Sequence, residues 1–193
     1  METGILILAA GNSSRFGRPK QLLDFKGKSL LRHVSQESLK ISKSVVVVTG
    51  SNHSEISKEI DDLQVKIIEN LNWFEGMGSS IHIGFKQLLK LFPEIENCII
   101  SVCDQPFIDA SVFSELIQMQ KDSQKGIVAS KYADTLGTPV LFTDKYFQNL
   151  SNLSGHEGAK KLLHKFKDNI AEINFEKGAI DIDTQEDYKK LNQ

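Results

Sequence analysis

The chain has 193 residues, of which 40% are hydrophobic and 25% are charged, and its formal net charge is −2 at neutral pH. This length suits one domain over residues 1–193, and folding should bury roughly 70% of the surface of the unfolded chain. The small negative charge argues against a nucleic acid polymer as the main partner, because such a protein needs a basic face. The N-terminal apolar run is short and has no basic residue ahead of it, so it indicates a first strand and not a signal peptide. No run reaches membrane-spanning length, and we expect a cytoplasmic protein that does not act on a membrane.

Apolar, strand-like runs alternate with amphipathic helical stretches along the chain. This alternation is typical of an α/β protein with a Rossmann-like, mostly parallel open sheet and helices on both faces. Strands are predicted at 4–9, 45–49, 65–68, 97–102, 126–130, 138–142 and 170–174. Helices are predicted at 29–40, 53–61, 79–91, 109–121, 156–166 and 184–191. In such a sheet the ligand crevice lies beyond the carboxyl ends of the strands.

The first predicted strand runs into a loop of small residues that carries fixed positive charge. Its glycines and serines let backbone N–H groups approach an anion closely, and its basic side chains supply charge-assisted donors. An ordinary turn with solvated cations is the alternative, but such a turn needs fewer glycines and basic residues. The loop matches neither G-x-x-x-x-G-K-[ST] nor G-x-G-x-x-G, so it indicates a phosphate site of another type. Its candidate binding residues are Ala10, Gly11, Ser13, Ser14, Arg15 and Lys20.

The sequence of this loop, L-A-A-G-N-S-S-R-F-G-R-P-K at 8–20, resembles the signature loop of the MobA-like nucleotidyltransferases. Arg15 and Lys20 fall on the basic positions of that signature. The resemblance is closest to the molybdenum cofactor cytidylyltransferases, whose loop also reads Ala-Ala-Gly where the guanylyltransferases usually read Ala-Gly-Gly. It implies a loop that wraps the triphosphate of an NTP, with CTP favoured and GTP as the alternative.

A glycine-rich segment then precedes the helix predicted at 79–91. The segment offers close backbone approach and unpaired N–H groups at a helix start, which suit a nucleotide, but a capped helix with an entry loop explains it equally well. The segment also resembles the N-x-x-W-x-x-G-M-x-x-S element that lines the nucleotide pocket of the family. The resemblance makes Asn70, Gly78 and Ser79 candidate binding residues.

Asp104 follows a continuous apolar strand, and Pro106 prevents that strand from pairing further. Asp104 lies too far ahead of the next predicted helix to cap it, and Asp109 suits that role better. A carboxylate at the edge of the sheet suits Mg²⁺, which prefers oxygen ligands. The segment resembles the metal-binding Asp-x-Pro element of the family. Cys103, at odd spacing from Cys98, should point to the opposite face of the sheet, so both thiols are expected to be free.

Asp183 is the second candidate metal ligand. Its neighbours Thr184 and Asp187 indicate a capping box at a helix start, which is a purely structural role. Asp183 precedes that cap, and its segment resembles the Asp-Thr-Pro-Glu-Asp element whose leading residue joins the metal site in related enzymes. Gln185 stands where proline is usual. Asp181 is a less favoured ligand, and the expected ion is Mg²⁺, with Mn²⁺ as the alternative.

Two segments resemble the acceptor side of the family but depart from its pattern. Thr138 stands where the cytidylyltransferases usually have histidine in Gly-His-Pro. His156 and Lys160 stand for the aspartate and arginine of Gly-Asp-x-Gly-Ala-Arg. Because lysine lacks the bidentate fork of arginine, these changes alter which anionic group is recognised.

The resemblance implies an enzyme that transfers CMP from CTP to the terminal phosphate of molybdopterin or its molybdenum-bearing form, with release of pyrophosphate. Arg15 and Lys20 would hold the phosphates, and Asp104 and Asp183 would anchor the metal. Two enzyme alternatives stay open, guanylyl transfer from GTP and transfer to another phosphorylated acceptor such as a sugar phosphate. A non-catalytic nucleotide-binding accessory protein, acting with a molybdoenzyme or its chaperone, is the alternative of another class.

Overall fold

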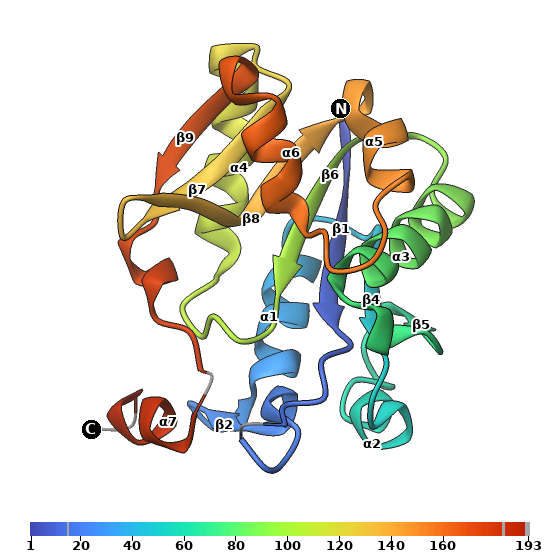
Figure 1. The fold of residues 1–193 in the computed structure, drawn as a ribbon, viewed down its shortest axis with the longest axis vertical. Helices are drawn as coiled ribbons and strands as arrows, with labels where there is room; N and C mark the ends of the chain where they lie inside the picture. Colours follow the sequence, from blue (N-terminus) through green and yellow to red (C-terminus); the bar gives the residue numbers. More distant parts are fainter. Residues whose placement is uncertain (15, 183, 192–193) are drawn as a thin grey trace.

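The computed structural model describes residues 1–14, 16–182 and 184–191. Its centre is a seven-stranded sheet in the order β5-β4-β1-β6-β8-β7-β9 (Figure 1). Within this sheet, as far as the structure describes it, only β8 runs against its neighbours. The predicted Rossmann-like, mostly parallel sheet is therefore confirmed. The strands are β1 (Glu2–Ala9), β4 (Val45–Thr49), β5 (Lys66–Glu69), β6 (Ile95–Val102), β7 (Ile127–Tyr132), β8 (Thr135–Thr143) and β9 (Ile170–Asn174).

Helices cover both faces of this sheet, as predicted. One face is packed by α1 (Leu30–Leu39), α2 (His53–Lys58) and α4 (Ala110–Ser123). The other is packed by α3 (Met77–Leu91), α5 (Phe147–Ser151) and α6 (Ala159–Lys165). None of the helices in the described ranges is long and apolar enough to cross a membrane. Short 3-10 turns are found at Lys20–Leu22, Trp73–Glu75, Asp144–Tyr146, Lys167–Asn169 and Glu176–Ala179.

The two cores follow from the alternation of side chains along each strand. In β1, Leu6 and Leu8 pack under α3, whereas Ile5 and Ile7 pack under α1, so the whole strand is apolar. Cys98 and Cys103 obey the same alternation and lie in opposite cores as free, buried thiols. The predicted lack of a disulfide between them is confirmed.

Strand β1 lies between β4 and β6. The strands that follow β1 in this sheet are first added on one side of it, as β4 and β5, and then on its other side, from β6 onward. Such a switch point is where open α/β sheets bind ligands. Leu8 pairs with Val102 across β1 and β6, so the segments that follow these parallel strands emerge side by side. The prediction that both segments open onto one edge of the sheet is confirmed.

The C-terminal segment folds back onto this edge, where α7 (Gln185–Leu191) lies beside the hairpin of β2 (Asp24–Phe25) and β3 (Lys28–Ser29) (Figure 1). A small apolar cluster joins them, and the rings of Phe16 and Tyr188 meet edge to face with centroids 6.2 Å apart. The sequence did not predict the hairpin or α5.

Candidate nucleotide site

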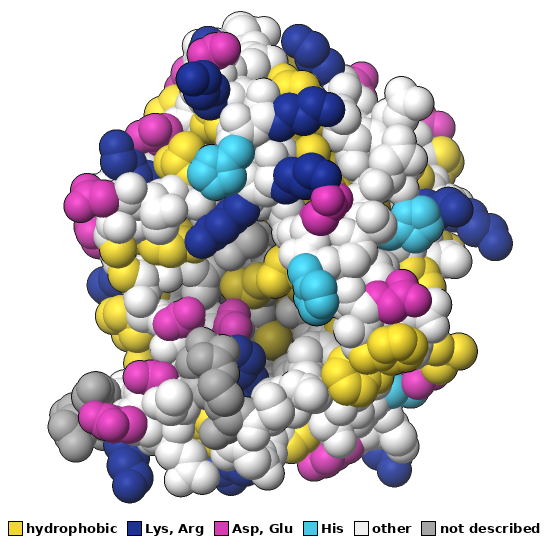
Figure 2. All heavy atoms as spheres, viewed as in Figure 1, with side chains coloured by type: hydrophobic (Ala, Val, Ile, Leu, Met, Phe, Trp, Pro, Cys, Tyr) yellow, Lys and Arg dark blue, Asp and Glu magenta, His cyan; other side chains and the backbone are white. Residues whose placement is uncertain are grey.

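A cavity of about 390 Å³ opens at the carboxyl edge of the sheet, beyond β1 and β6. Figure 2 shows a hollow near the middle of this face, with cationic and acidic side chains along its lower margin. Four of the predicted site residues line the cavity, namely Ala10, Gly11, Lys20 and Asp104. The remaining lining residues include Asn12, Gln21, Trp73, Phe74, Met77, Ser80, Cys103 and His156.

Lys20 and Asp104 meet at the edge of this cavity. The Lys20 Nζ atom donates a hydrogen bond of 2.6 Å to Asp104 Oδ2, and the two side chains are only 17% and 24% exposed. Partial burial reduces solvent screening, so the pair interacts more strongly than a surface ion pair. The lysine predicted to bind phosphate oxygens and the carboxylate predicted to bind a metal ion therefore lie in direct contact.

Gln21 holds the loop that carries Lys20, a role that the sequence reasoning missed. Its amide nitrogen donates to the carbonyl oxygens of Ala9 at 2.9 Å and Gly11 at 2.8 Å. Its amide oxygen accepts a hydrogen bond from the Ser13 hydroxyl at 3.3 Å, and that hydroxyl accepts from the Lys20 N–H at 3.0 Å. Gln21 is 1% exposed, so these bonds are shielded from water. No local motif signals this role, because its partners come together only when the loop folds back.

The other predicted residues of this loop lie off the cavity. The Ser13 side chain is turned into the loop by the bonds just described, and Ser14 is exposed beyond it. Neither serine lines the cavity. Their contact with a triphosphate stays a prediction. Arg15, predicted to bind the phosphates, lies outside the described residues.

Asn70 organises the start of α3. Its amide nitrogen donates to the hydroxyls of Ser79 at 2.9 Å and Ser80 at 3.0 Å, and its amide oxygen accepts from the Asn72 N–H at 3.0 Å. Asn70 and Ser79 line a separate depression beside α3, whereas Ser80 lines the cavity itself. The predicted contact of Asn70 and Ser79 with a nucleotide stays untested.

Gly78, the third candidate in this segment, packs α3 against the loop that leads into α6. Its N–H donates to the Gly155 carbonyl oxygen at 2.8 Å, and a Cβ atom at position 78 would lie 2.5 Å from the Ser154 carbonyl oxygen. Only glycine permits this approach. The contact brings His156 to the cavity. The helix predicted at 156–166 begins only at Ala159, so His156 lies in the loop before it.

The acidic residues separate into structural and metal-binding candidates. Asp109 caps α4, as expected, and Thr184 and Asp187 form the predicted capping box of α7, with Thr184 N–H donating to Asp187 Oδ2 at 2.8 Å. Asp183 lies outside the described residues. The preceding residue, Ile182, donates its N–H to the Asp104 carbonyl oxygen at 3.0 Å, so the chain passes directly beside Asp104 there.

A divalent cation fits the oxygen donors at this edge. Within the described ranges no group of three acidic, histidine or cysteine side chains forms a metal centre. Mg²⁺ and Mn²⁺, however, are commonly held by one or two carboxylates together with the phosphate oxygens of a substrate. Asp104, which lies beside the loop that carries Lys20, is predicted to supply one such carboxylate.

Cys103 does not supply a nucleophile to the cavity that it lines. Burial, assisted by the nearby Asp104 carboxylate, raises the pKa of its thiol to about 12. Burial also raises the pKa of Cys98. Because the thiolate is the reactive form, covalent chemistry at either cysteine is disfavoured near neutral pH.

Comparison with known proteins gives a consistent picture. The family model described as MobA-like NTP transferase domain matches residues 5–170. A curated relative from Bacillus cereus (strain G9842), named probable molybdenum cofactor guanylyltransferase, is 29% identical over 126 residues, which are 64% of this chain. The match spans 59% of that relative's own length.

Solved structures match over nearly the whole fold. The crystal structure of Rv0371c from Mycobacterium tuberculosis H37Rv superimposes with a TM-score of 0.80 at 25% identity, covering 99% of this chain and 97% of that one. A second structure of Rv0371c, in complex with manganese, gives a TM-score of 0.77 at 23% identity, covering 99% and 98%. The fold is therefore shared along essentially the full length.

Proposed function

Because this chain belongs to the MobA-like NTP transferase domain family, we propose that it moves an NMP unit from an NTP to a phosphorylated acceptor and releases pyrophosphate. One observation carries the proposal, the direct contact of Lys20 with Asp104 at the cavity beyond β1 and β6. Phosphoryl-type transfer depends mainly on positioning and on neutralising charge. The contact supports this proposal, because a cation and a carboxylate meet at a single edge of the sheet.

The names of the relatives support a choice of donor and acceptor. The curated relatives that match this chain over 126 residues are named probable molybdenum cofactor guanylyltransferases. These names support GTP as the donor and a molybdopterin-type acceptor. The Ala-Ala-Gly sequence of the loop favoured CTP. We take GTP as the donor because the relatives match over a far longer stretch than that tripeptide.

The reaction needs no general base. A phosphate oxygen of the acceptor attacks the α-phosphorus of GTP and forms a P–O–P bond to it. The bond from the α-phosphorus to the bridging oxygen breaks, and pyrophosphate leaves with the electron pair. The attacking phosphate is already an anion near neutral pH, since its second pKa is about 6. Lys20 would neutralise charge on the leaving pyrophosphate, while Gln21 keeps the loop in place.

A divalent cation would act as a Lewis acid on the phosphate oxygens. Asp104 and Asp183 are the residues proposed to hold it. The manganese complex of Rv0371c supports an ion of this class, Mg²⁺ or Mn²⁺. Removal of the ion with a chelator should abolish pyrophosphate release, and either ion should restore it.

Pyrophosphate release tests this function directly. The protein is incubated with Mg²⁺, molybdopterin and each of the four NTPs in turn, and GTP is expected to give the highest rate. A highest rate with CTP would overturn the choice of donor, and release with a sugar phosphate but not with molybdopterin would overturn the acceptor. Tight binding of GTP without pyrophosphate release would instead identify a non-catalytic accessory protein.

A further inference from the structure

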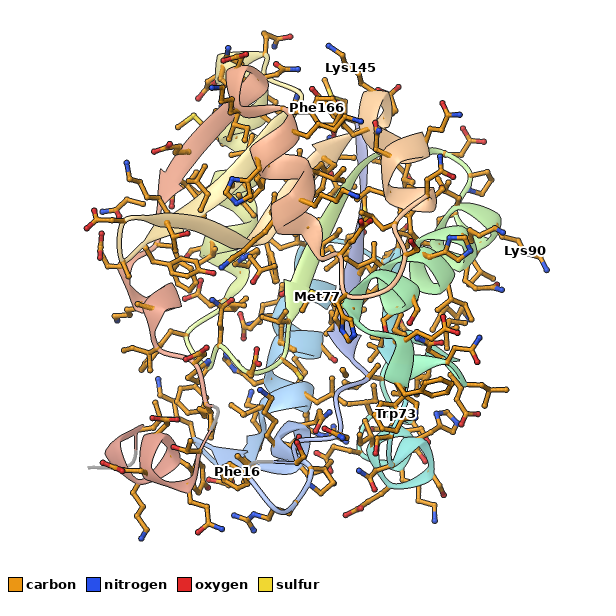
Figure 3. All side chains as sticks on the ribbon, viewed as in Figure 1. Phe16, Trp73, Met77, Lys90, Lys145 and Phe166 are labelled. Atoms are coloured by element: carbon orange, nitrogen blue, oxygen red, sulfur yellow. The ribbon has the colours of Figure 1, made fainter. Side chains whose placement is uncertain are left out.

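A second cavity, of about 350 Å³, adjoins the first and is bounded by β6, β8 and α6. The two cavities share Met77, Val102 and His156 as a common wall. Met77, the first residue of α3, lies beside the loop that leads into α6 (Figure 3), and its sulfur would lie 2.9 Å from a Cβ atom at Gly158. A molecule in the second cavity is therefore next to the phosphates in the first.

The floor of the second cavity is apolar. Ile100, Ala159 and Leu163 are buried there, so a ligand gains free energy by covering them. The Thr138 hydroxyl is already engaged, since it donates to Gln105 Oε1 at 3.3 Å. Gln105 in turn donates to the Gly178 carbonyl oxygen at 2.7 Å. The floor suits a flat or apolar body and not a sugar with many hydroxyls.

The rim, by contrast, carries two unpaired donors. His156 and Lys160 are exposed, and neither makes a hydrogen bond or an ion pair with any residue that the structure describes. The adjacent lysine behaves differently, because Lys161 forms an ion pair with Glu157. Lysine side chains lie along α6, and basic side chains gather above the hollow in Figure 2.

We propose that the second cavity takes the apolar ring body of the acceptor, and that His156 and Lys160 select an acceptor that carries an anionic group on that ring. This inference rests on the proposed function and names the substrate class of its acceptor side. At these two positions the rim offers donors and no carboxylate, so an anion is favoured over a cation.

Direct binding of pterin-6-carboxylate, a flat fluorescent ring with one carboxylate, tests this inference without turnover. Its affinity is measured by fluorescence anisotropy for the wild type, Lys160→Glu and His156→Asp. Each substitution should weaken binding about tenfold, because a donor to the carboxylate of the probe is replaced by a carboxylate that repels it. Lys161→Glu makes the same change in charge one position along α6 but off the cavity, and it should alter affinity by no more than about twofold. Saturating GTP should not displace the probe.

Three results would overturn the inference: no probe binding by the wild type, equal loss in Lys160→Glu and Lys161→Glu, or displacement of the probe by GTP. Circular dichroism verifies that the variants are folded. Where one is not, the corresponding glutamine variant, Lys160→Gln, His156→Gln or Lys161→Gln, replaces it. Pyrophosphate release from GTP is measured separately, and none of these three results requires it to be absent. Failure of this inference is therefore distinguishable from failure of the proposed function.

Discussion

The contact of Lys20 with Asp104 gives each side chain a defined task in the proposed reaction. Loss of one preorganised charge contact commonly lowers turnover about a hundred- to a thousandfold, so Lys20→Ala and Asp104→Asn should each fall by that amount. The measurement is the rate of pyrophosphate release at saturating GTP.

A lysine in an ion pair far from the cavity serves as the control for this experiment. Lys131 on β7 pairs with Glu172 on the neighbouring edge strand β9 at 3.0 Å. Lys131→Ala should keep the wild-type rate, since exposed pairs contribute little. Wild-type turnover in Lys20→Ala would remove the basis of the mechanism.

The hydrogen bonds of Gln21 contribute to the stability of the fold. In Gln21→Ala the carbonyl oxygens of Ala9 and Gly11 lose their donor, so the free energy of unfolding should fall by about 1–3 kcal/mol. The loop that carries Lys20 loosens, and KM for GTP should rise. Urea unfolding and steady-state kinetics measure the two effects.

Gln118, exposed on α4 with a hydrogen bond to Asp122, is the matched control for Gln21. Gln118→Ala should change stability by no more than about 0.5 kcal/mol. If Gln21→Ala behaves like Gln118→Ala, then Gln21 does not hold the loop.

Among the helices, the stability of α4 depends on the Asp109 side chain that caps its N-terminus. Asp109 Oδ1 accepts from the N–H groups of Ser111 at 2.9 Å and Val112 at 3.2 Å. Burial alone would raise the pKa of Asp109, but the hydrogen bonds from Ser111 and Val112 outweigh burial and lower it. Asp109→Ala should reduce the free energy of unfolding by about 1 kcal/mol at neutral pH.

The pH dependence of this cap has a definite sign. Because the folded pKa of Asp109 is lowered, its charged form contributes stability above the unfolded value of about 3.9. That contribution is lost as the pH falls through the folded pKa. Urea unfolding at several pH values should show the wild type and Asp109→Ala converging in acid. Asp109→Asn keeps an acceptor without the charge, so its loss at neutral pH should be smaller than that of Asp109→Ala, and its gap to the wild type should also shrink as the pH falls. An equal gap at all pH values for Asp109→Ala would refute the charged cap.

The elements differ in how far the sequence could predict them. Strands such as Val45–Thr49 are continuous apolar runs and were located correctly. The β2–β3 hairpin was missed because each strand has only two residues, although Lys26 and Gly27 both adopt positive φ in its turn. The helix predicted to begin at 156 begins at Ala159, because the preceding residues pack against Gly78.

In the whole molecule, the site forms from segments that are distant in the chain. The alternation of strands and helices predicted the sheet, and the rule for carboxyl ends predicted that Gly11 and Asp104 share one edge. The bonds of Gln21 and the contact of Ile182 with Asp104 could not be predicted, since they exist only once the loop and the chain end are folded. The second cavity likewise depends on how α6 packs on β8.

Transfer of label from GTP labelled at the α-phosphorus tests the central claim most directly. With molybdopterin and Mg²⁺ or Mn²⁺ present, the label should appear in the acceptor in step with pyrophosphate release, and Asp104→Asn should reduce both about a hundredfold or more. Label recovered as free GMP, or equal transfer by the wild type and Asp104→Asn, would contradict nucleotidyl transfer at the edge of the sheet where Lys20 meets Asp104.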